Sequence, residues 1–426
     1  VLDQRPAGRE VELVDPAVLA VRAEPLERGQ MRVELGDARV VGRQRVPVGL
    51  HPRADLEREM RRGGAHELRQ LVLVGKVVLV LHAGHGPEAT SGAYDRRMRR
   101  IAGVFLELRV IPVLLWSFTA ITLGTALAVH DGGSLNVAGY LVAVAVGVLL
   151  QGCVAHTVNE LADWRSGTDR DPAPRTISGG SKVIAAGLLS ERELAALGIA
   201  AGVGAVVLGL AAAAIWSWAL LIYGALGLLG AVLYTLPPVR AAYRPLWGEG
   251  IAFVCVWACA TGAYLLQTDT LTAAVMLVGA AHAAFCVAML MMHHYLDRGP
   301  DRRAVPPKTT TLVQLGDRAR VYALAWAGAA LAAAVLAAAV VDPAFAILAG
   351  AYLVALAPHL TPDLDSPGGV TRAELAVIAL GIAGGLGTAV ALAPSLAWVL
   401  AAPLVLVPLE LRVAGTALAP LRERSL

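Results

Sequence analysis

The residues best suited to chemistry lie in two acidic segments of the chain, each following a long apolar run. In the first segment, Asn159 and Asp163 are four residues apart and Glu160 follows Asn159 directly. If a helix continues through this segment, Asn159 and Asp163 share one face and Glu160 lies nearby. Gly167 then permits a turn that would bring Asp169 back toward that face. The spacing predicts a cluster of oxygen ligands at the end of a helix.

The second acidic segment repeats this pattern. Asp297 and Asp301 are again four residues apart at the end of an apolar run. Carboxylates at a helix C-terminus meet the negative end of the macrodipole, so a cation should offset the repulsion. Mg²⁺ fits, because it prefers oxygen ligands and is usually shared between a few carboxylates and a substrate's phosphates. The expected metal ligands are Asn159, Glu160, Asp163, Asp169, Asp297 and Asp301.

Basic residues are interleaved with these acids. Arg175, Lys182 and Lys308 are suited to hold the remaining charge of a phosphate group. One acidic loop alone would usually be a solvated surface loop, but two loops with matched spacing and basic neighbours favour a functional site. The adjacent His293 and His294 are either interfacial side chains or substrate contacts.

The elements that must position these residues are membrane helices. The 426 residues are 57% hydrophobic and 16% charged, and the mean hydropathy is +0.62. In soluble domains about a quarter of the residues are charged. The net charge of +3 gives no indication of a nucleic-acid partner. We expect an all-α bundle of about nine spans, at 104–129, 137–158, 193–214, 217–238, 248–267, 271–294, 321–341, 344–360 and 373–394. The apolar stretch Trp398–Leu409 is a tenth span, an interfacial helix or the end of the ninth.

The distribution of Lys and Arg predicts the orientation of the bundle. Alternate connections near residues 130–136, 215–216, 267–270 and 342–343 contain neither residue, whereas the other connections contain nearly all of them. By the positive-inside rule, the basic connections face the cytoplasm. Both acidic segments belong to these basic connections, so we expect them on the cytoplasmic side of a bacterial-type membrane.

Residues 1–97 differ from the rest of the chain. They are rich in Arg and Val, contain no Ile, Phe, Trp, Asn or Cys, and have Lys76 and Tyr94 as their only Lys and Tyr. We expect either a poorly ordered extension or translated sequence upstream of a true start at Met98. The membrane domain is therefore expected to occupy residues 98–426.

The two acidic segments resemble the signature motifs of the UbiA superfamily of intramembrane prenyltransferases, over roughly Arg99 to the C-terminus. The first family motif, NDxxDxxxGxD, is matched by Asn159, Asp163, Gly167 and Asp169, with Glu160 in place of an Asp. The second, DxxxD with a basic segment and a Thr-Leu…Leu-Gly ending, is matched by Asp297, Asp301, Lys308, Thr311, Leu312, Leu315 and Gly316. The stretch from Tyr234 to Glu249 resembles the branch that prenylates 1,4-dihydroxy-2-naphthoate in menaquinone biosynthesis.

This resemblance implies Mg²⁺-dependent transfer of a polyprenyl group from polyprenyl diphosphate to an aromatic acceptor, with 1,4-dihydroxy-2-naphthoate as the first candidate. It implies catalytic roles for Asp163, Asp297 and Lys182, and diphosphate binding by Asn159, Arg175, Lys182 and Lys308. Candidate contacts to the acceptor are Tyr234, His293, His294 and Tyr295. For both tyrosines, packing in the core is an equally good interpretation.

Three departures from the family pattern leave the acceptor open. Family members usually carry Asn at His293 or His294, the linker to Lys308 is longer and contains Pro306-Pro307, and Glu160 replaces Asp. Another phenolic acceptor in specialised metabolism is the alternative within the family. A cation-coupled transporter is the alternative of another class, but transporter sites usually lie near the bilayer midplane, whereas these acids lie at helix ends.

Overall fold

The computed structural model describes residues 21–26, 30–35, 91–169, 179–361 and 366–424. The chain divides into two compact units, Val1–Gly86 and Pro87–Leu426. In the first unit, strands β1 (Val21–Leu26) and β2 (Gln30–Leu35) form an antiparallel pair. This hairpin was not predicted from the sequence.

The prediction for residues 1–97, disorder or a non-native origin, falls mostly outside the described residues. The described part begins a helix, α3 (Ser91–Leu108), before Met98. The domain boundary expected at residue 97 therefore falls inside α3.

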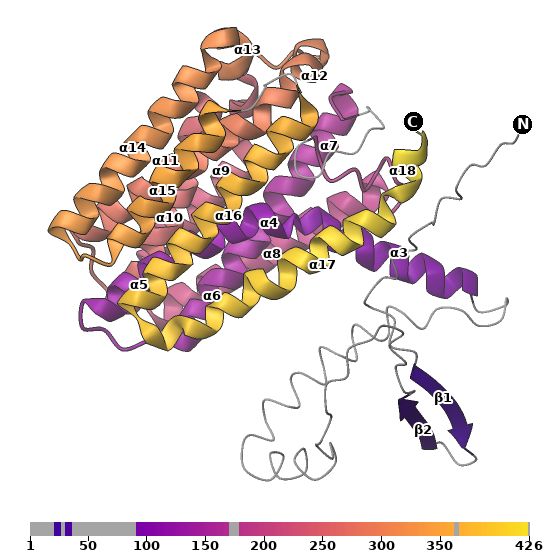
Figure 1. Cartoon of the computed structure of the whole chain (residues 1–426), viewed down its shortest axis with the longest axis horizontal. Coiled ribbons are helices and arrows are strands. Elements are labelled where there is room, and N and C mark those ends of the chain that lie inside the picture. Colours follow the sequence, from indigo (N-terminus) through magenta and orange to yellow (C-terminus); the bar gives the residue numbers. More distant parts are fainter. Residues whose placement is uncertain (1–20, 27–29, 36–90, 170–178, 362–365, 425–426) are drawn as a thin grey trace, which may run out of the picture. The chain divides into compact units, whose positions relative to one another are not determined.

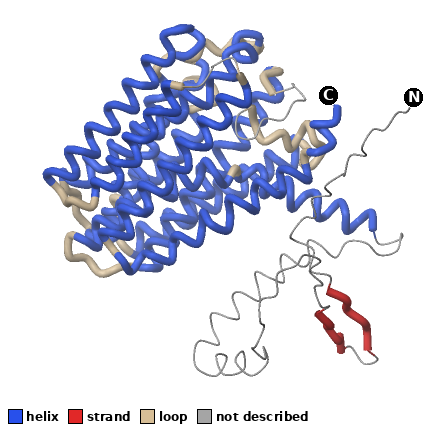
Figure 2. Tube along the Cα trace, viewed as in Figure 1, coloured by secondary structure: helices blue, strands red, loops and turns tan. Residues whose placement is uncertain are grey.

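All regular elements described in the second unit are helices, and the long ones lie side by side in a bundle (Figures 1 and 2). The first apolar run forms α3, α4 (Val110–Val113), the π-helical turn η1 (Leu114–Phe118) and α5 (Thr119–His130). The second forms α6 (Val137–Gly147), the π-helical segment η2 (Val148–Ala155) and α7 (His156–Ser166). The later long helices are α8 (Glu191–Ile215), α10 (Trp247–Thr268), α11 (Ala273–His294), α14 (Ala319–Val340), α16 (Pro367–Leu392) and α17 (Ala401–Ala417), the last preceded by η6 (Pro394–Leu400). Shorter helices are α9 (Leu220–Leu233), η3 (Ala241–Tyr243), η4 (Tyr295–Asp297), α12 (Arg298–Arg303), α13 (Thr311–Leu315), η5 (Gly316–Arg318), α15 (Phe345–Leu360) and α18 (Ala419–Arg424).

These helices confirm the predicted membrane spans. Within the described residues, eight helical segments are long and apolar enough to cross a membrane, and α9 and α15 are shorter apolar helices. Each of the nine expected spans coincides with one of these ten. The tenth, Pro394–Ala417, contains the stretch that the hydropathy left open, and it is long enough to be a span of its own.

Small residues allow the central helices to approach one another closely. A Cβ atom on Gly124 of α5 would overlap the backbone of Ala260 in α10. A Cβ atom on Gly385 of α16 would overlap the side chain of Thr119 in α5. Association of helices in a membrane depends on such close packing, so these glycines fix α5 between α10 and α16.

The first span is interrupted at Arg109, next to the site described below. Arg109 adopts a left-handed backbone conformation, with φ of 46° and ψ of 63°, and it separates α3 from α4. The break exposes the first N–H groups of α4, which have no partner within the helix. A side chain from the other end of the sequence meets this need, because Ile111 N donates to Glu410 Oε2 of α17 at 2.7 Å.

Candidate active site

The first acidic segment folds back on the end of α7. Gly167 ends this helix with φ of 86°, a conformation that glycine adopts without strain. The turn places Asp169 N 3.3 Å from Asp163 O. Asp169 therefore returns to the end of the helix, as the position of Gly167 predicted.

Gly180 packs against two of these carboxylates from the other side. Its φ is 79°, and a Cβ atom there would overlap the carboxylate oxygens of both Asp169 and Glu160. The next residue, Ser181, donates from its backbone N to Glu160 Oε2 at 2.8 Å. Its hydroxyl donates to Glu107 Oε2 at 2.6 Å. Glu107, on α3, therefore joins the first acidic cluster.

The second acidic segment continues as a helix. Asp297 is the last residue of η4 and Asp301 lies one turn further on, in α12. The loop after α12 contacts the first segment, because Val305 N donates to Ser166 O at 3.1 Å. The two acidic segments, far apart in the sequence, thus meet at one end of the bundle, where Figure 1 shows α7, α12 and α13.

Lys308 links the two acidic segments directly. Its ammonium group forms an ion pair with Asp163, and its Nζ lies 3.9 Å from Asp301 Oδ1. Its backbone N donates to Asp301 O at 3.0 Å. The ammonium group also lies 5.2 Å from the centre of the Tyr243 ring, in cation–π geometry.

The electrostatic surroundings keep Lys308 charged. Burial lowers the pKa of this side chain, because it disfavours the ammonium form. The carboxylates of Asp163 and Asp301 raise the pKa by more than burial lowers it, so the net pKa lies well above its ordinary value. The site therefore holds a permanent cation between its two carboxylate groups.

Lys182 has a different position from Lys308. Its Nζ donates to the backbone O of Asp169 at 2.9 Å and lies 3.7 Å from Asp169 Oδ1. Lys182 is buried and is not among the residues that line the cavity described next. Its contacts hold Asp169 in place behind the acidic cluster.

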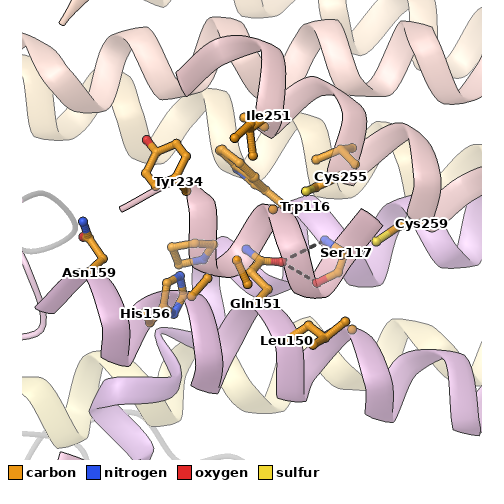
Figure 3. A pocket seen from close by; sticks show the side chains of 18 of the residues that line it. Trp116, Ser117, Leu150, Gln151, His156, Asn159, Tyr234, Ile251, Cys255 and Cys259 are labelled. Atoms are coloured by element: carbon orange, nitrogen blue, oxygen red, sulfur yellow. Dashed lines mark hydrogen bonds between the residues drawn. The ribbon is translucent and has the colours of Figure 1, made fainter. Parts of the chain in front are cut away.

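The acidic end opens into a cavity of about 320 Å³ inside the bundle. Figure 3 shows Asn159 and His156 of α7 at one part of its wall, and Trp116, Leu150, Ile251, Cys255 and Cys259 along the rest. The wall is mainly apolar, with a polar exception where Ser117 donates from both its N and its hydroxyl to Gln151 Oε1. The cavity can therefore hold a ligand with a charged head near the acids and an apolar body among the helices.

Most of the predicted site residues line this cavity. They are Asn159, Asp163, Asp169, Tyr234, His293, His294, Asp297, Asp301 and Lys308. Glu160 and Lys182 lie behind the wall in contact with residues of the site, and Tyr295 is buried in the hydrophobic core. Arg175 lies outside the described residues.

Three ionisable residues at the site were missed as site residues from the sequence. His156 lines the cavity, and its Nδ1 lies 3.2 Å from Leu108 O. Glu374 of α16 is fully buried and its Oε1 lies 2.7 Å from Nδ1 of His293. Glu107 lies within the first expected span, 104–129. All three lie inside or beside apolar runs, and a charge in such a run is the signal that could have identified them.

The donor atoms at the site fit the predicted Mg²⁺. Among the residues that the structure describes, no three His, Cys, Asp or Glu side chains lie close enough to share an ion. Mg²⁺ does not require such a set, because it usually takes one or two carboxylates together with phosphate oxygens and water. The two acidic segments offer five buried carboxylates, which outnumber the buried ammonium groups of Lys182 and Lys308. The Oε1 atom of Glu107 is also buried and accepts no hydrogen bond from any described residue.

Comparison with known proteins identifies relatives of this chain. The model of the UbiA prenyltransferase family matches residues 117–366, more than half of the chain. The 1,4-dihydroxy-2-naphthoate octaprenyltransferase of Escherichia coli (strain K12) is 27% identical over 213 residues, which cover 48% of this chain and 67% of that protein.

Two solved structures are similar in fold at low sequence identity. A UbiA homolog from Archaeoglobus fulgidus, bound to DMAPP and Mg²⁺, is 16% identical with a TM-score of 0.48, and the match covers 66% of this chain and 98% of that one. The apo structure of a UbiA homolog from Aeropyrum pernix K1 is 19% identical with a TM-score of 0.47, covering 63% and 96%.

Proposed function

Since this chain belongs to the UbiA prenyltransferase family and is an integral membrane protein, we propose that it transfers a polyprenyl group from polyprenyl diphosphate to 1,4-dihydroxy-2-naphthoate, in a reaction that requires Mg²⁺. The observation that carries this proposal is the junction of the two acidic segments, linked by Lys308, at the charged end of a largely apolar cavity. A diphosphate with a long apolar tail matches both parts of this site.

The proposed metal ligands are drawn from the residues predicted from the sequence. Asp163 and Asp169 on one side and Asp297 and Asp301 on the other line the cavity, and Asn159 adds an amide oxygen. Glu160 supports this set from behind the wall, through its hydrogen bond with Ser181 N. When bound, Mg²⁺ would neutralise charge on the diphosphate and so make it a better leaving group.

The side chains of this protein contribute binding and electrostatic stabilisation. Lys308 and Asn159 are suited to bind the diphosphate oxygens, and Lys308 can stabilise the negative charge that grows as the C–O bond to the prenyl group breaks. Lys182 acts indirectly, because its contacts hold Asp169 in position. The apolar wall excludes water, which would otherwise capture the prenyl cation before the acceptor does.

The choice of acceptor rests on two sequence similarities. The stretch Tyr234–Glu249 resembles the naphthoate-prenylating branch, and the Escherichia coli relative prenylates 1,4-dihydroxy-2-naphthoate by its name. Tyr234, His293 and His294 line the cavity near the acids and are the proposed neighbours of the acceptor ring. In the proposed reaction, the ring carbon replaces its carboxylate with the prenyl group and releases CO₂.

The proposed location is the cytoplasmic membrane, with the acidic end facing the cytoplasm. The support is the positive-inside distribution of Lys and Arg. A single cysteine at the exposed Arg303 should react with a membrane-impermeant maleimide only in inverted vesicles, and one at the exposed Asp269 only in right-side-out vesicles. The opposite labelling pattern would reverse the proposed orientation.

The decisive experiment is a transfer assay on the purified protein in lipid nanodiscs. It would contain Mg²⁺, radiolabelled polyprenyl diphosphate and, in turn, dihydroxynaphthoate, 4-hydroxybenzoate or homogentisate. We expect a prenylated naphthoquinol that forms only with Mg²⁺. Transfer to another ring would keep the reaction and change the acceptor, whereas no transfer and no diphosphate binding would refute the proposed function.

A further inference from the structure

A hydrogen bond at the cavity wall joins His293, a proposed neighbour of the acceptor ring, to the carboxylate of Glu374. His293 Nδ1 lies 2.7 Å from Glu374 Oε1, and Glu374 has no exposed surface. The two residues come from different helices, α11 and α16. A carboxylate is costly inside a membrane protein unless it has a polar partner, and His293 is that partner for Glu374.

The pairing leaves one ring nitrogen for the cavity. His293 lies on the cavity wall together with Asn159, Asp297 and Lys308. With Nδ1 donating to the carboxylate of Glu374, Nε2 is the nitrogen that can accept a proton from a bound molecule. A carboxylate behind a histidine fixes the tautomer and stabilises the imidazolium that forms when the ring takes up a proton.

We propose that His293 is the general base that deprotonates the ring hydroxyl of the acceptor, and that Glu374 is its positioning residue. This inference rests on the proposed function, since it needs a hydroxylated aromatic ring in the cavity. It adds a specificity rule, namely that the acceptor must present an ionisable hydroxyl group to His293.

The hydroxyl proton passes to Nε2 of His293, and the O–H bonding pair is delocalised into the ring. A ring carbon forms a bond to C1 of the prenyl group while the C1–O bond breaks, and that bonding pair leaves with the diphosphate. The carboxylate leaves the same ring carbon as CO₂, its bonding pair restores the aromatic ring, and the imidazolium proton passes to the ring oxygen.

Other histidines surround the pair. The ring of His294 is centred 5.8 Å from that of His293, and His156 of α7 lines the same cavity. Because these groups would also affect a pH–rate profile, such a profile would not isolate His293. The acidity of the acceptor is a cleaner variable. Substituents change the reactivity of the ring equally in wild type and variant, so a steeper dependence of kcat on acceptor acidity in the variant reports the loss of the base.

The variants for the test follow from the geometry. In H293N, the amide N–H₂ group can replace Nδ1–H as the donor to Glu374, while the basic Nε2 is lost. In E374Q, a carbonyl oxygen still accepts from Nδ1, but the negative charge is lost. H130N is the matched control, because His130 lies 3.5 Å from Asp342 in a similar pair that does not line the cavity.

Each variant would be assayed for thermal stability and for kcat with a series of ring-substituted acceptors of graded hydroxyl pKa. We expect H293N to keep its fold and to lose about 10²-fold in kcat, with the largest loss for the least acidic hydroxyl. E374Q should lose less, with the same trend, and H130N should match the wild type.

Two results would overturn the proposal while prenyl transfer by the wild type stands. The first is a kcat of H293N within twofold of the wild type for all acceptors. The second is an equal loss of kcat for all acceptors, which would indicate that His293 acts only through packing. If H293N does not fold, E374Q supplies the test. A loss of kcat in E374Q that is equal for all acceptors would then refute the role of His293 as general base. No transfer by the wild type to any acceptor would instead refute the proposed function and the base with it.

Discussion

Replacement of Lys308 by Met tests whether the two acidic segments need a cation between them. Met keeps the apolar stem of the side chain and removes its charge. In the wild type, the side chains of Lys308 and Asp163 are 7% and 9% exposed, so the variant leaves buried carboxylates that face each other uncompensated. Breaking a buried ion pair by removing one partner costs about 3–5 kcal/mol. We therefore expect K308M to lose about that much free energy of unfolding in Mg²⁺-free buffer.

The assay is unfolding by SDS titration in mixed micelles, with and without Mg²⁺ and inorganic diphosphate. If the acids form the metal site, Mg²⁺ should restore much of the stability of K308M and add less to the wild type. A second replacement, D163N, should recover stability in the K308M background, because it removes one of the unpaired charges. The control is R165A, whose pair with Glu191 has side chains 65% and 40% exposed and should contribute less than about 1 kcal/mol.

The pH dependence of this difference is also fixed by the structure. A raised pKa in the folded state means that Lys308 contributes its full stability below the unfolded value, about 10.4. This contribution is lost only as the pH rises above that value, through the higher pKa of the folded protein. Lys308 itself therefore adds no pH dependence between pH 7 and pH 9. In K308M, loss of the cation favours the protonated form of the buried carboxylates that it faced, so the stability deficit of K308M should grow as the pH rises from 7 to 9. An unchanged stability of K308M in Mg²⁺-free buffer, or no response to D163N, would refute this account of the acidic junction.

Three other predictions concern the acids and their support. D297N keeps the shape of the side chain but removes its charge, so prenyl transfer should fall by at least about 10²-fold while size-exclusion behaviour is unchanged; full activity would remove Asp297 from the site. G180A should lose both stability and transfer activity, since its methyl group would displace two carboxylates. G187A has a similar positive φ but no atom within 4 Å of its added Cβ, so it should lose only about 1 kcal/mol, and equal activity losses in both would contradict the argument. Chelation with EDTA should abolish transfer and added Mg²⁺ should restore it, whereas transfer in EDTA would exclude a metal role.

Local rules in the sequence predicted the helices and the turn at the first acidic cluster. Apolar length alone located the spans, and a glycine at position 167 followed by Asp169 indicated a chain reversal that the structure contains. These features depend on a few neighbouring residues. The same reasoning left Trp398–Leu409 open, because two prolines interrupt it, and in the structure this stretch is continuous with a helix up to Ala417.

Contacts between distant segments were not predictable in this way. The sequence indicated that Lys182 and Lys308 are both suited to bind phosphate, but only the tertiary structure separates them. Lys308 lies on the cavity wall, whereas Lys182 lies behind Asp169. Glu374 was overlooked because averaging over an apolar window hides one acid near the start of a span. Its partner, His293, is separated from it in the sequence by α14 and α15, so no local pattern indicated that the two are neighbours.

The hydrogen bond between Ile111 and Glu410 has a consequence for biosynthesis. The two residues are 299 positions apart, so the broken first helix enters the membrane long before the ribosome has made the side chain that completes it. Until α17 is inserted, the N–H groups at the start of α4 need a temporary partner such as water or a chaperone. The break beside the acidic cluster therefore takes its final form only after α17 has been made and has reached α4.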